Sequence, residues 1–462
     1  MIGKNILRTP PPKRCSGLIH KDGVSERLTA MSTPTKKAKS AKRDPQENKI
    51  ANSLEETPSG ITVISSAGDV VLLIQRDTPT QELCRYRVDS ARLRGASTYF
   101  SRLFSDDYKE GTDVALAHTQ LRTKYTTLDA SVPADELPEV KIVDVGRISP
   151  TVKTIKPLMA DFLCALHARD LTTLTPPLAN VANLCIVADR FDCLVPWRAY
   201  CKSHKIIAAL DGKSNTKVAA TWTEERTRQR LLVGIFLDNA SWVYQASLRL
   251  IHRGWVGREP EEDAALWWDL PMGMEDELLF RRDCILQTAQ SIQTHFLTLY
   301  TSRERQCKLG YDSSAECDMF QLGQTIKFFK RINTLSLEGT IFATTETPEP
   351  YEGDILDLVD SFKQAPEYQV DKNHHHCGIR TRIMPLLDLL VLALGEVGVC
   401  WWCWQDCRHD YAWSKVKRPL VWKKDSAGAS MHQHYKNRQA QSHLFKHLDT
   451  RDLFMANERL WT

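Results

Sequence analysis

The segment GDVVLLIQRDTPTQELCRYRVDSARLRGASTYFSRLF spans residues 68 to 104 and decides the fold of the chain around it. Residues 70 to 74 are a β-branched and aliphatic run without helical spacing, which is typical of a strand buried on both faces. A polar turn around Asp77, Thr78 and Pro79 follows, and LCRYRV, residues 83 to 88, then alternates between two sets of side chains. The two runs predict a β-hairpin.

Two short helices are predicted after the hairpin. Asp89 and Ser90 are residue types that cap helix N-termini, and Ser97 begins a second helix whose apolar residues share one side. Strands and helical stripes need one another's apolar faces, so we expect one shared core. Its expected members are Val70, Leu72, Phe100, Leu103, Phe162 and Leu166.

The rest of the chain is predicted to be mainly helical. Residues 106 to 138 are polar and weakly patterned and predict a long loop, and EVKIVDV from Glu139 predicts another strand. Apolar residues three or four apart predict helices between residues 151 and 167 and again after Pro177. Beyond about residue 210, the same spacing predicts one helix carrying residues 231 to 250 and another carrying residues 285 to 296.

This order of hairpin, paired short helices, loop, strand and two longer helices resembles the BTB/POZ domain in its divergent fungal form. Glu110 and Gly111 stand where divergent fungal members place such a pair, and the segments 162–167 and LCIVADRFDCLVPW resemble the family's later helices. The resemblance covers residues 61 to 205 and implies an α/β (α+β) domain followed by a mainly α-helical region. It rests on Asp69, Val70, Val88, Ser90, Leu93, Ser97, Phe100 and Phe104.

The resemblance implies protein–protein assembly, with other proteins as partners and self-association through this domain. No reactive group is needed for that function: Ser97 and Phe100 are expected to pack where helix meets sheet, and Asp69 to satisfy backbone donors at the start of the strand. Many relatives recruit cullin-type ubiquitin ligases through a hydrophobic-x-Glu element. That element cannot be located after Asp106, so weak or absent cullin recruitment is expected.

Composition and length set the expected domain organisation. The chain has 462 residues, of which 42% are hydrophobic and 26% charged, as in ordinary globular proteins, and this length favours two or three folded units. We assign residues 1–60 to a disordered basic arm, 61–210 to the BTB/POZ-like domain, 211–372 to a helical region, and 373–462 to a helical C-terminal region with a polar tail. The arm lacks apolar periodicity, so no self-association through it is expected.

The basic residues of the arm bear on where the protein resides in the cell and not on what it binds. In PTKKAKSAKR, residues 34 to 43, a nuclear import signal is one hypothesis and a solvated tail the other. Nucleic acid is not an expected partner, since the arm has no aromatic residue to stack bases. Thirteen unevenly spaced cysteines and a start without a signal-peptide core favour an intracellular place, nuclear, cytoplasmic or both. The basic residues concerned are Lys36, Lys37, Lys39, Lys42 and Arg43.

One apolar stretch and one cysteine cluster require a choice between two interpretations. Asp388 and Glu396 interrupt the stretch 386–404, which favours a buried helix over a membrane span. In CWWCWQDCRH, residues 400 to 409, cysteines at i, i+3 and i+7 share a helix face with tryptophans, as buried apolar residues do. We therefore expect no metal or cofactor; the candidate ligands, should a metal bind, are Cys400, Cys403, Cys407 and His409, to which HHHC at 374–377 can add.

Two functional hypotheses remain. No HExxH, GxSxG, Walker A or GxGxxG motif is present, so the sequence gives no support for an enzyme. The leading hypothesis is an adaptor that acts through its BTB/POZ-like domain without catalysis. The alternative is a helical enzyme or metal-binding regulator with its site in residues 211 to 462.

Overall fold

A computed structural model describes residues 54–76, 82–212, 221–308, 314–336, 351–423 and 442–461. The predicted import segment and the turn at Asp77 lie outside these ranges, as does most of the predicted arm. The described chain is mixed α/β and mainly helical, as the sequence predicts.

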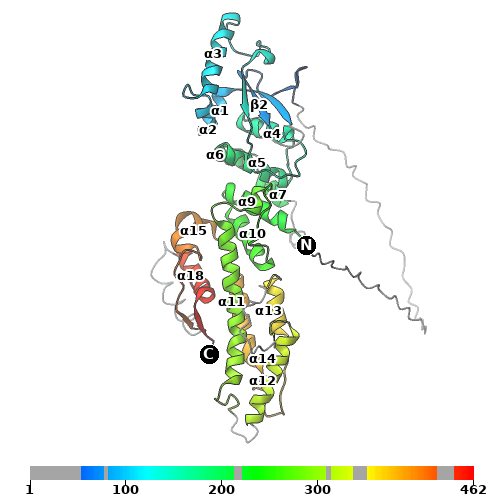
Figure 1. The fold of residues 1–462 in the computed structure, drawn as a ribbon, viewed down its shortest axis with the longest axis vertical. Helices are drawn as coiled ribbons and strands as arrows, with labels where there is room; N and C mark the ends of the chain where they lie inside the picture. The colour runs from blue at the N-terminus through cyan, green and yellow to red at the C-terminus, as the bar shows by residue number, and fades with distance from the viewer. Residues whose placement is uncertain are drawn as a thin grey trace, which may run out of the picture. The chain divides into compact units, whose positions relative to one another are not determined.

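A four-stranded sheet opens the described chain (Figure 1). It contains β1 (Ile61–Val63), β2 (Val70–Gln75), β3 (Leu83–Val88) and β4 (Glu139–Ile142), in the order β1-β3-β2-β4. β2 and β3 are antiparallel with Val70 opposite Val88, which confirms the predicted hairpin. β4 runs parallel to β2, and β1 runs parallel to β3.

The two short helices after the hairpin begin where the capping residues predict. In α1 (Ser90–Ala96), the Asp89 carboxylate accepts hydrogen bonds from the backbone N–H groups of Ala91 and Arg92. In α2 (Thr98–Leu103), the Ser97 hydroxyl accepts one from the Phe100 N–H. Both caps satisfy donors that a helix cannot satisfy within itself.

The predicted long loop after Asp106 is wrong, because α3 (Lys109–Lys124) occupies half of it. Only Gly111 and Val114 of this helix are buried. A helix that buries so few residues needs no apolar stripe, so the sequence carries almost no periodic signal for it. A Cβ atom at Gly111 would lie 2.0 Å from the carbonyl oxygen of Ser105, which would be a clash. Glycine therefore allows α3 to pack closely against the chain that leaves α2.

Four helices follow β4 and cover the sheet or continue from it. They are α4 (Lys156–Leu166), α5 (Leu178–Arg190), α6 (Leu194–Ser203) and α7 (Ile206–Gly212). The helices predicted at 151–167 and after Pro177 correspond to α4 and α5. Both are buried over most of their lengths. The Tyr86 hydroxyl of β3 donates to the Lys156 carbonyl at 2.8 Å and so fixes the start of α4.

The single helix predicted over residues 231–250 is two helices, α9 (Glu224–Phe236) and α10 (Ala240–Arg253). The apolar spacing continues across the break, which hides it from a periodicity argument. Asp238 has a positive φ of 54°, and the Asn239 side chain caps α10 by accepting from the Trp242 N–H. These two polar residues end one helix and begin the next.

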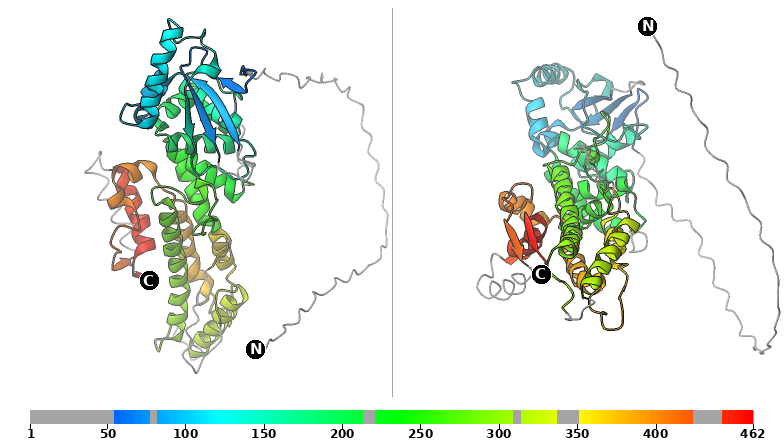
Figure 2. Two further views of the ribbon diagram at one scale, coloured as in Figure 1. Left: turned by 45° about the horizontal axis from the view of Figure 1, so that its top comes forward. Right: turned by 60° about the horizontal axis from the view of Figure 1, so that its bottom comes forward.

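The long helix α11 (Met274–Thr301) organises the remaining chain. In Figures 1 and 2 it runs with α12 (Ser314–Arg331), α13 (Ile355–Lys363) and α14 (Ile379–Leu394) on one side, and the C-terminal elements lie on the other. The C-terminal elements are α15 (Trp401–Asp406), α16 (Arg408–Tyr411), β5 (Val421–Lys423), α18 (Ser442–Met455) and β6 (Glu458–Leu460), with two short 3₁₀ turns at Ala134–Glu136 and Leu266–Trp268 elsewhere.

One apolar cluster contains buried residues from Ile64 to Trp461, on both sides of position 210. Val70, Leu72, Phe100 and Phe162 are buried in it, while Leu103 and Leu166 pack against it half-buried, so the predicted shared core is present. The apolar stretch at 386–404 folds as the end of α14 and the start of α15. Among the described residues, no helix combines the length and the apolar character that crossing a membrane requires.

We expect Phe100→Ala to lower the free energy of unfolding by about 3–5 kcal/mol, because the ring is 1% exposed and its loss leaves a cavity. The measurement is urea denaturation followed by circular dichroism. Leu116→Ala, at a 61% exposed position of α3, is the control and should change that free energy by less than about 0.5 kcal/mol. Equal effects of the two substitutions would contradict the described core.

Candidate functional site

Asp69 ties the start of β2 to the start of α1. Its two carboxylate oxygens accept hydrogen bonds from the Ser90 backbone N–H at 2.8 Å and from the Ser90 hydroxyl at 2.7 Å. The expectation that Asp69 serves donors at the start of its own strand is therefore corrected: the donors belong to helix α1. This carboxylate is used for local structure.

Ser97 and the aromatic residues near it fasten α2 to the end of α5. The Ser97 hydroxyl donates to the carbonyl oxygen of Phe191 at 2.5 Å, and the Phe100 ring stacks on Phe191 with a centroid distance of 5.4 Å. The remaining resemblance residues, Val70, Val88, Leu93 and Phe104, are buried in the same core. The residues that carry the resemblance thus act together as packing and capping groups.

His167 follows α4 and bridges it to α1 as a neutral imidazole. Its Nε2 accepts from the Asp89 backbone N–H at 3.1 Å, so the proton resides on Nδ1, which donates to the Leu163 carbonyl at 2.8 Å. Burial lowers the pKa of His167 below its ordinary value of 6.5. Protonation would remove the acceptor that the Asp89 N–H requires.

The sequence-predicted ligands at 400–409 come together only in part. The ligand atoms of Cys400 and Cys403 lie within 4.8 Å of one another and of a ring nitrogen of His447 on α18. Cys407 is half-buried, with Sγ 3.4 Å from the Cys403 carbonyl oxygen, and His409 is exposed. Hydrogen bonds from Cys403 and His447 lower the pKa of the Cys400 thiol.

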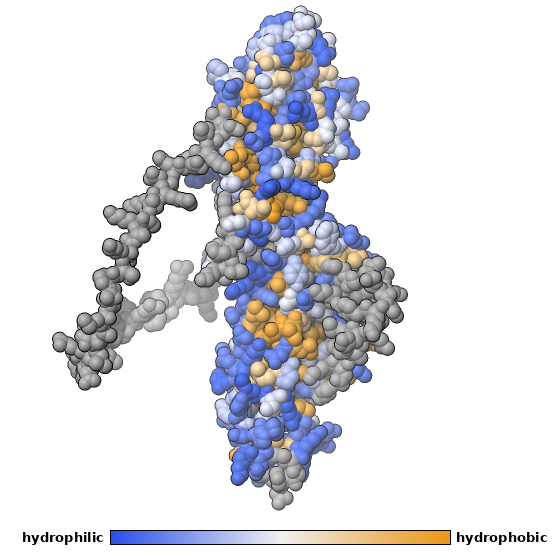
Figure 3. Space-filling model, turned by 180° about the vertical axis from the view of Figure 1, so that it is seen from behind, coloured by the Kyte–Doolittle hydropathy of each residue, from blue (hydrophilic) through white to orange (hydrophobic). Residues whose placement is uncertain are grey.

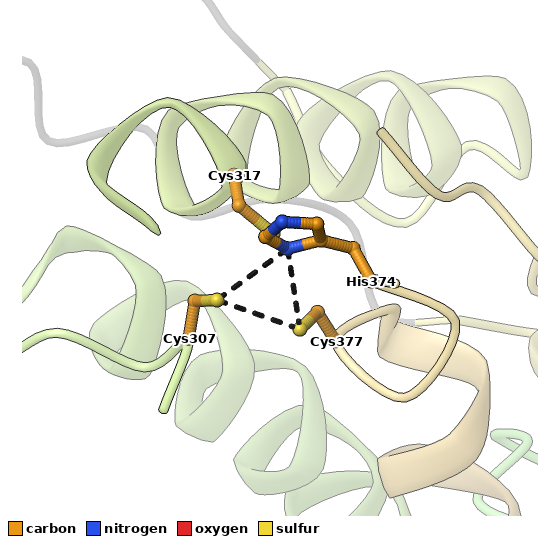
Figure 4. A group of neighbouring side chains, drawn as sticks. All are labelled: Cys307, Cys317, His374 and Cys377. Carbon is orange, nitrogen blue, oxygen red and sulfur yellow. Dashed lines mark hydrogen bonds between the residues drawn. The ribbon is translucent and has the colours of Figure 1, made fainter. Parts of the chain in front are cut away.

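A second group collects His374 and Cys377 of the HHHC segment with two cysteines that the sequence argument did not consider. Cys307 follows α11, Cys317 lies in the first turn of α12, and His374 and Cys377 precede α14 (Figure 4). One ligand atom from each lies within 4.8 Å of the others, and all four residues are buried. The HxxC spacing at 374–377 was a visible signal, whereas nothing local links it to residues 307 and 317.

The measured separations within this group are short. The Cys307 Sγ lies 3.5 Å from the His374 Nδ1 and 3.7 Å from the Cys377 Sγ, and the Cys377 Sγ lies 3.8 Å from the same Nδ1. Burial raises the pKa of the Cys317 and Cys377 thiols. This set of three sulfurs and one imidazole nitrogen matches the donors that bind zinc in proteins.

Two cavities flank α11 near this group. One of about 710 Å³ is lined by α11 and the C-terminal strand, and its polar groups bond one another: Arg418 donates to the Gln287 side chain, and the Trp461 indole donates to Ser291. The other, of about 520 Å³, is lined by Cys377, His376 and Arg382. The hydrogen bonds in the first cavity join α11 to the C-terminal segments.

Comparison with protein-family models found no match for this chain, and comparisons with curated proteins and with solved structures found none either.

We expect the neutral His167 to make folding sensitive to acid. Its folded-state pKa lies below the unfolded value, so the folded chain binds fewer protons. Its stabilising contribution is therefore fully present above about pH 6.5 and is lost as pH falls toward the folded-state pKa. The measurement is the free energy of unfolding at pH 7.5 and at pH 5.5.

His167→Gln should reduce the loss of stability between these two pH values, because glutamine does not titrate. His409→Gln, at an exposed position, is the control and should leave the pH dependence of the wild type unchanged. An identical pH dependence in wild type and His167→Gln would show that His167 is not held neutral.

Proposed function

We propose that this chain is an adaptor that binds another protein through its α/β part, residues 61 to 210, and that it carries out no chemistry of its own. The observation that carries the proposal is the role of the residues on which the BTB/POZ resemblance rests. Asp69, Ser90 and Ser97 bond within the fold, and the apolar members are buried. Because these polar side chains bond within the fold and are not arranged for catalysis, the part of the chain that carries them is suited to offer its outer surface to a partner protein.

That surface includes helix α3, which buries little of itself. Leu116 of α3 is 61% exposed, and Tyr108, just before the helix, is 49% exposed. Figure 3 shows that apolar residues on one face of the molecule gather in separate patches among hydrophilic ones. Exposed apolar and aromatic side chains in a polar setting are typical of protein–protein interfaces.

A metal-binding regulator is the second candidate function, and the buried cysteine–histidine groups in residues 307–447 favour it. The two candidates differ in where a partner binds. An adaptor of the proposed kind binds through the α/β part, whereas a regulator of the second kind acts through the helical part. A test should therefore change one part at a time in the full-length chain.

We expect Leu116→Asp to weaken capture of a partner protein at least tenfold, because a charge at an apolar contact must be desolvated on binding. The full-length chain is used as bait in a cell lysate, and captured proteins are quantified by mass spectrometry. The matched control is Leu392→Asp on α14, where the side chain is 74% exposed. Surface substitutions of this kind should leave stability within about 0.5 kcal/mol.

Val195→Asp on α6, at a 76% exposed position, extends the test to another face of the α/β part. A second, differently tagged copy of the chain in the same lysate reports self-association through this part. Partners that are retained by both α/β variants but lost with Leu392→Asp would contradict the adaptor proposal and favour the helical part as the binding region.

A further inference from the structure

We propose that Cys307, Cys317, His374 and Cys377 bind one zinc ion, which fastens α11, α12 and α14 together. The inference is independent of the adaptor proposal. It joins Cys307 and Cys317, which no sequence signal singles out, to the HHHC segment at 374–377 that the sequence offers as a source of additional ligands.

The separations within the group fit a tetrahedral zinc centre. Zinc bonds of about 2.3 Å to sulfur and 2.0–2.1 Å to nitrogen give tetrahedron edges of about 3.8 Å between sulfurs and about 3.6 Å between sulfur and nitrogen. The Sγ–Sγ separation of Cys307 and Cys377 is 3.7 Å, and their separations from the His374 Nδ1 are 3.5 and 3.8 Å. In Figure 4, Cys317 points from α12 toward the same center. Three of the donors therefore have the spacing of a tetrahedral zinc site, and the Cys317 Sγ lies within 4.8 Å of each of them.

Ordinary packing does not explain the group. Cys307, Cys317 and Cys377 form a small buried cluster that is separate from the large core. Within the described part of the chain, no aliphatic or aromatic residue belongs to this cluster. A histidine that is 1% exposed lies in the middle of it. Hydrogen bonds between thiol and imidazole join these groups in pairs, whereas one metal ion would engage all three sulfurs and the ring nitrogen together.

A disulfide does not explain the group either. The Sγ atoms of Cys307 and Cys377 are 3.7 Å apart, whereas a disulfide bond is about 2.05 Å long. A disulfide between any two of the three cysteines would also leave the third sulfur and His374 without a role.

The backbone around the ligands is held in place by neighbouring residues. The Asp318 carboxylate, next to Cys317, accepts from the backbone N–H groups of Gln306 at 2.8 Å and Cys307 at 2.9 Å. The Cys377 N–H donates to the His374 carbonyl at 3.0 Å, which forms a tight turn with both side chains on one side. The Tyr300 hydroxyl of α11 donates to the Cys377 carbonyl at 3.0 Å. The ligands are thus positioned by three different segments.

Asp371 supplies the outer partner that zinc-binding histidines usually have. Its Oδ2 lies 3.8 Å from the His374 Nε2, whereas the other ring nitrogen, Nδ1, contacts Cys307 and Cys377. At this distance the carboxylate acts electrostatically and without a hydrogen bond: it favours the tautomer that carries its proton on Nε2, which leaves the Nδ1 lone pair for a metal ion. Three thiolates and one imidazole suit zinc better than oxygen-preferring cations, and four buried protein ligands leave no open position for a substrate. The site is therefore structural.

The test measures zinc in the full-length chain, produced in zinc-supplemented medium and purified under reducing conditions without chelator. We expect Cys317→Ser and His374→Ala each to lose one zinc per chain relative to wild type, as measured by inductively coupled plasma mass spectrometry. Cys284→Ser, at another buried cysteine on α11, and His376→Ala, at the exposed neighbour of the ligands, are matched controls and should retain the wild-type content. Unchanged zinc content in both ligand variants would overturn the proposal.

Two measurements keep the test decisive if a ligand variant fails to fold. The wild-type chain reconstituted with Co²⁺ should give the intense visible bands of tetrahedral cobalt and the near-ultraviolet bands of thiolate coordination; absence of both would overturn the proposal. Asp371→Asn, at a half-exposed position, should weaken zinc retention about 10–100-fold against a chromophoric chelator. Lys372→Ala, in the same turn, is its control and should retain the wild-type affinity.

Discussion

Buried backbone carbonyl groups outside helices and sheets need hydrogen-bond donors. In this chain, arginine side chains from distant parts of the sequence supply many of these donors. Arg87 of β3 donates to the carbonyl oxygens of Gly68, Val132 and Asp129, which holds the segment before β4 against the sheet. Arg282 of α11 does the same for the end of α10 and the segment before α13. Each guanidinium offers five donors in one plane, so a single side chain can close several loops. Without these residues the connections between elements would bury unpaired carbonyls.

The same constraint explains how the arginines balance their charge. Arg281 donates to the Val397 and Gly398 carbonyls and pairs with Glu277, which itself accepts from the backbone N–H groups of Trp413 and Ser414. Arg228 pairs with Glu224 and Glu275 in a similar way. These cations are buried and committed to the fold, so they are not surface groups for binding phosphate.

The sequence predicted what depends on neighbouring residues and missed what depends on distant ones. The hairpin, the Asp89 and Ser97 caps and the α4 and α5 stripes follow from local patterns, and they agree with the structure. Helix α3 was missed because it depends on a glycine contact more than on an apolar stripe. Cys307 and Cys377 are separated by 70 positions and meet only because α11, α12 and α14 pack together. His447 likewise meets Cys400 and Cys403 only because α18 packs near α15, and no local sequence pattern links it to them.

The central claim is that the α/β part binds the partner, and hydrogen–deuterium exchange tests it most directly. The exchange of the full-length chain is measured alone and in complex with a protein that it captures. The account predicts slower exchange in peptides from residues 61 to 210, including α3, with little change elsewhere, because a bound partner covers the backbone of that surface. Slower exchange confined to residues 224 to 461 would contradict it and place the binding function in the helical part.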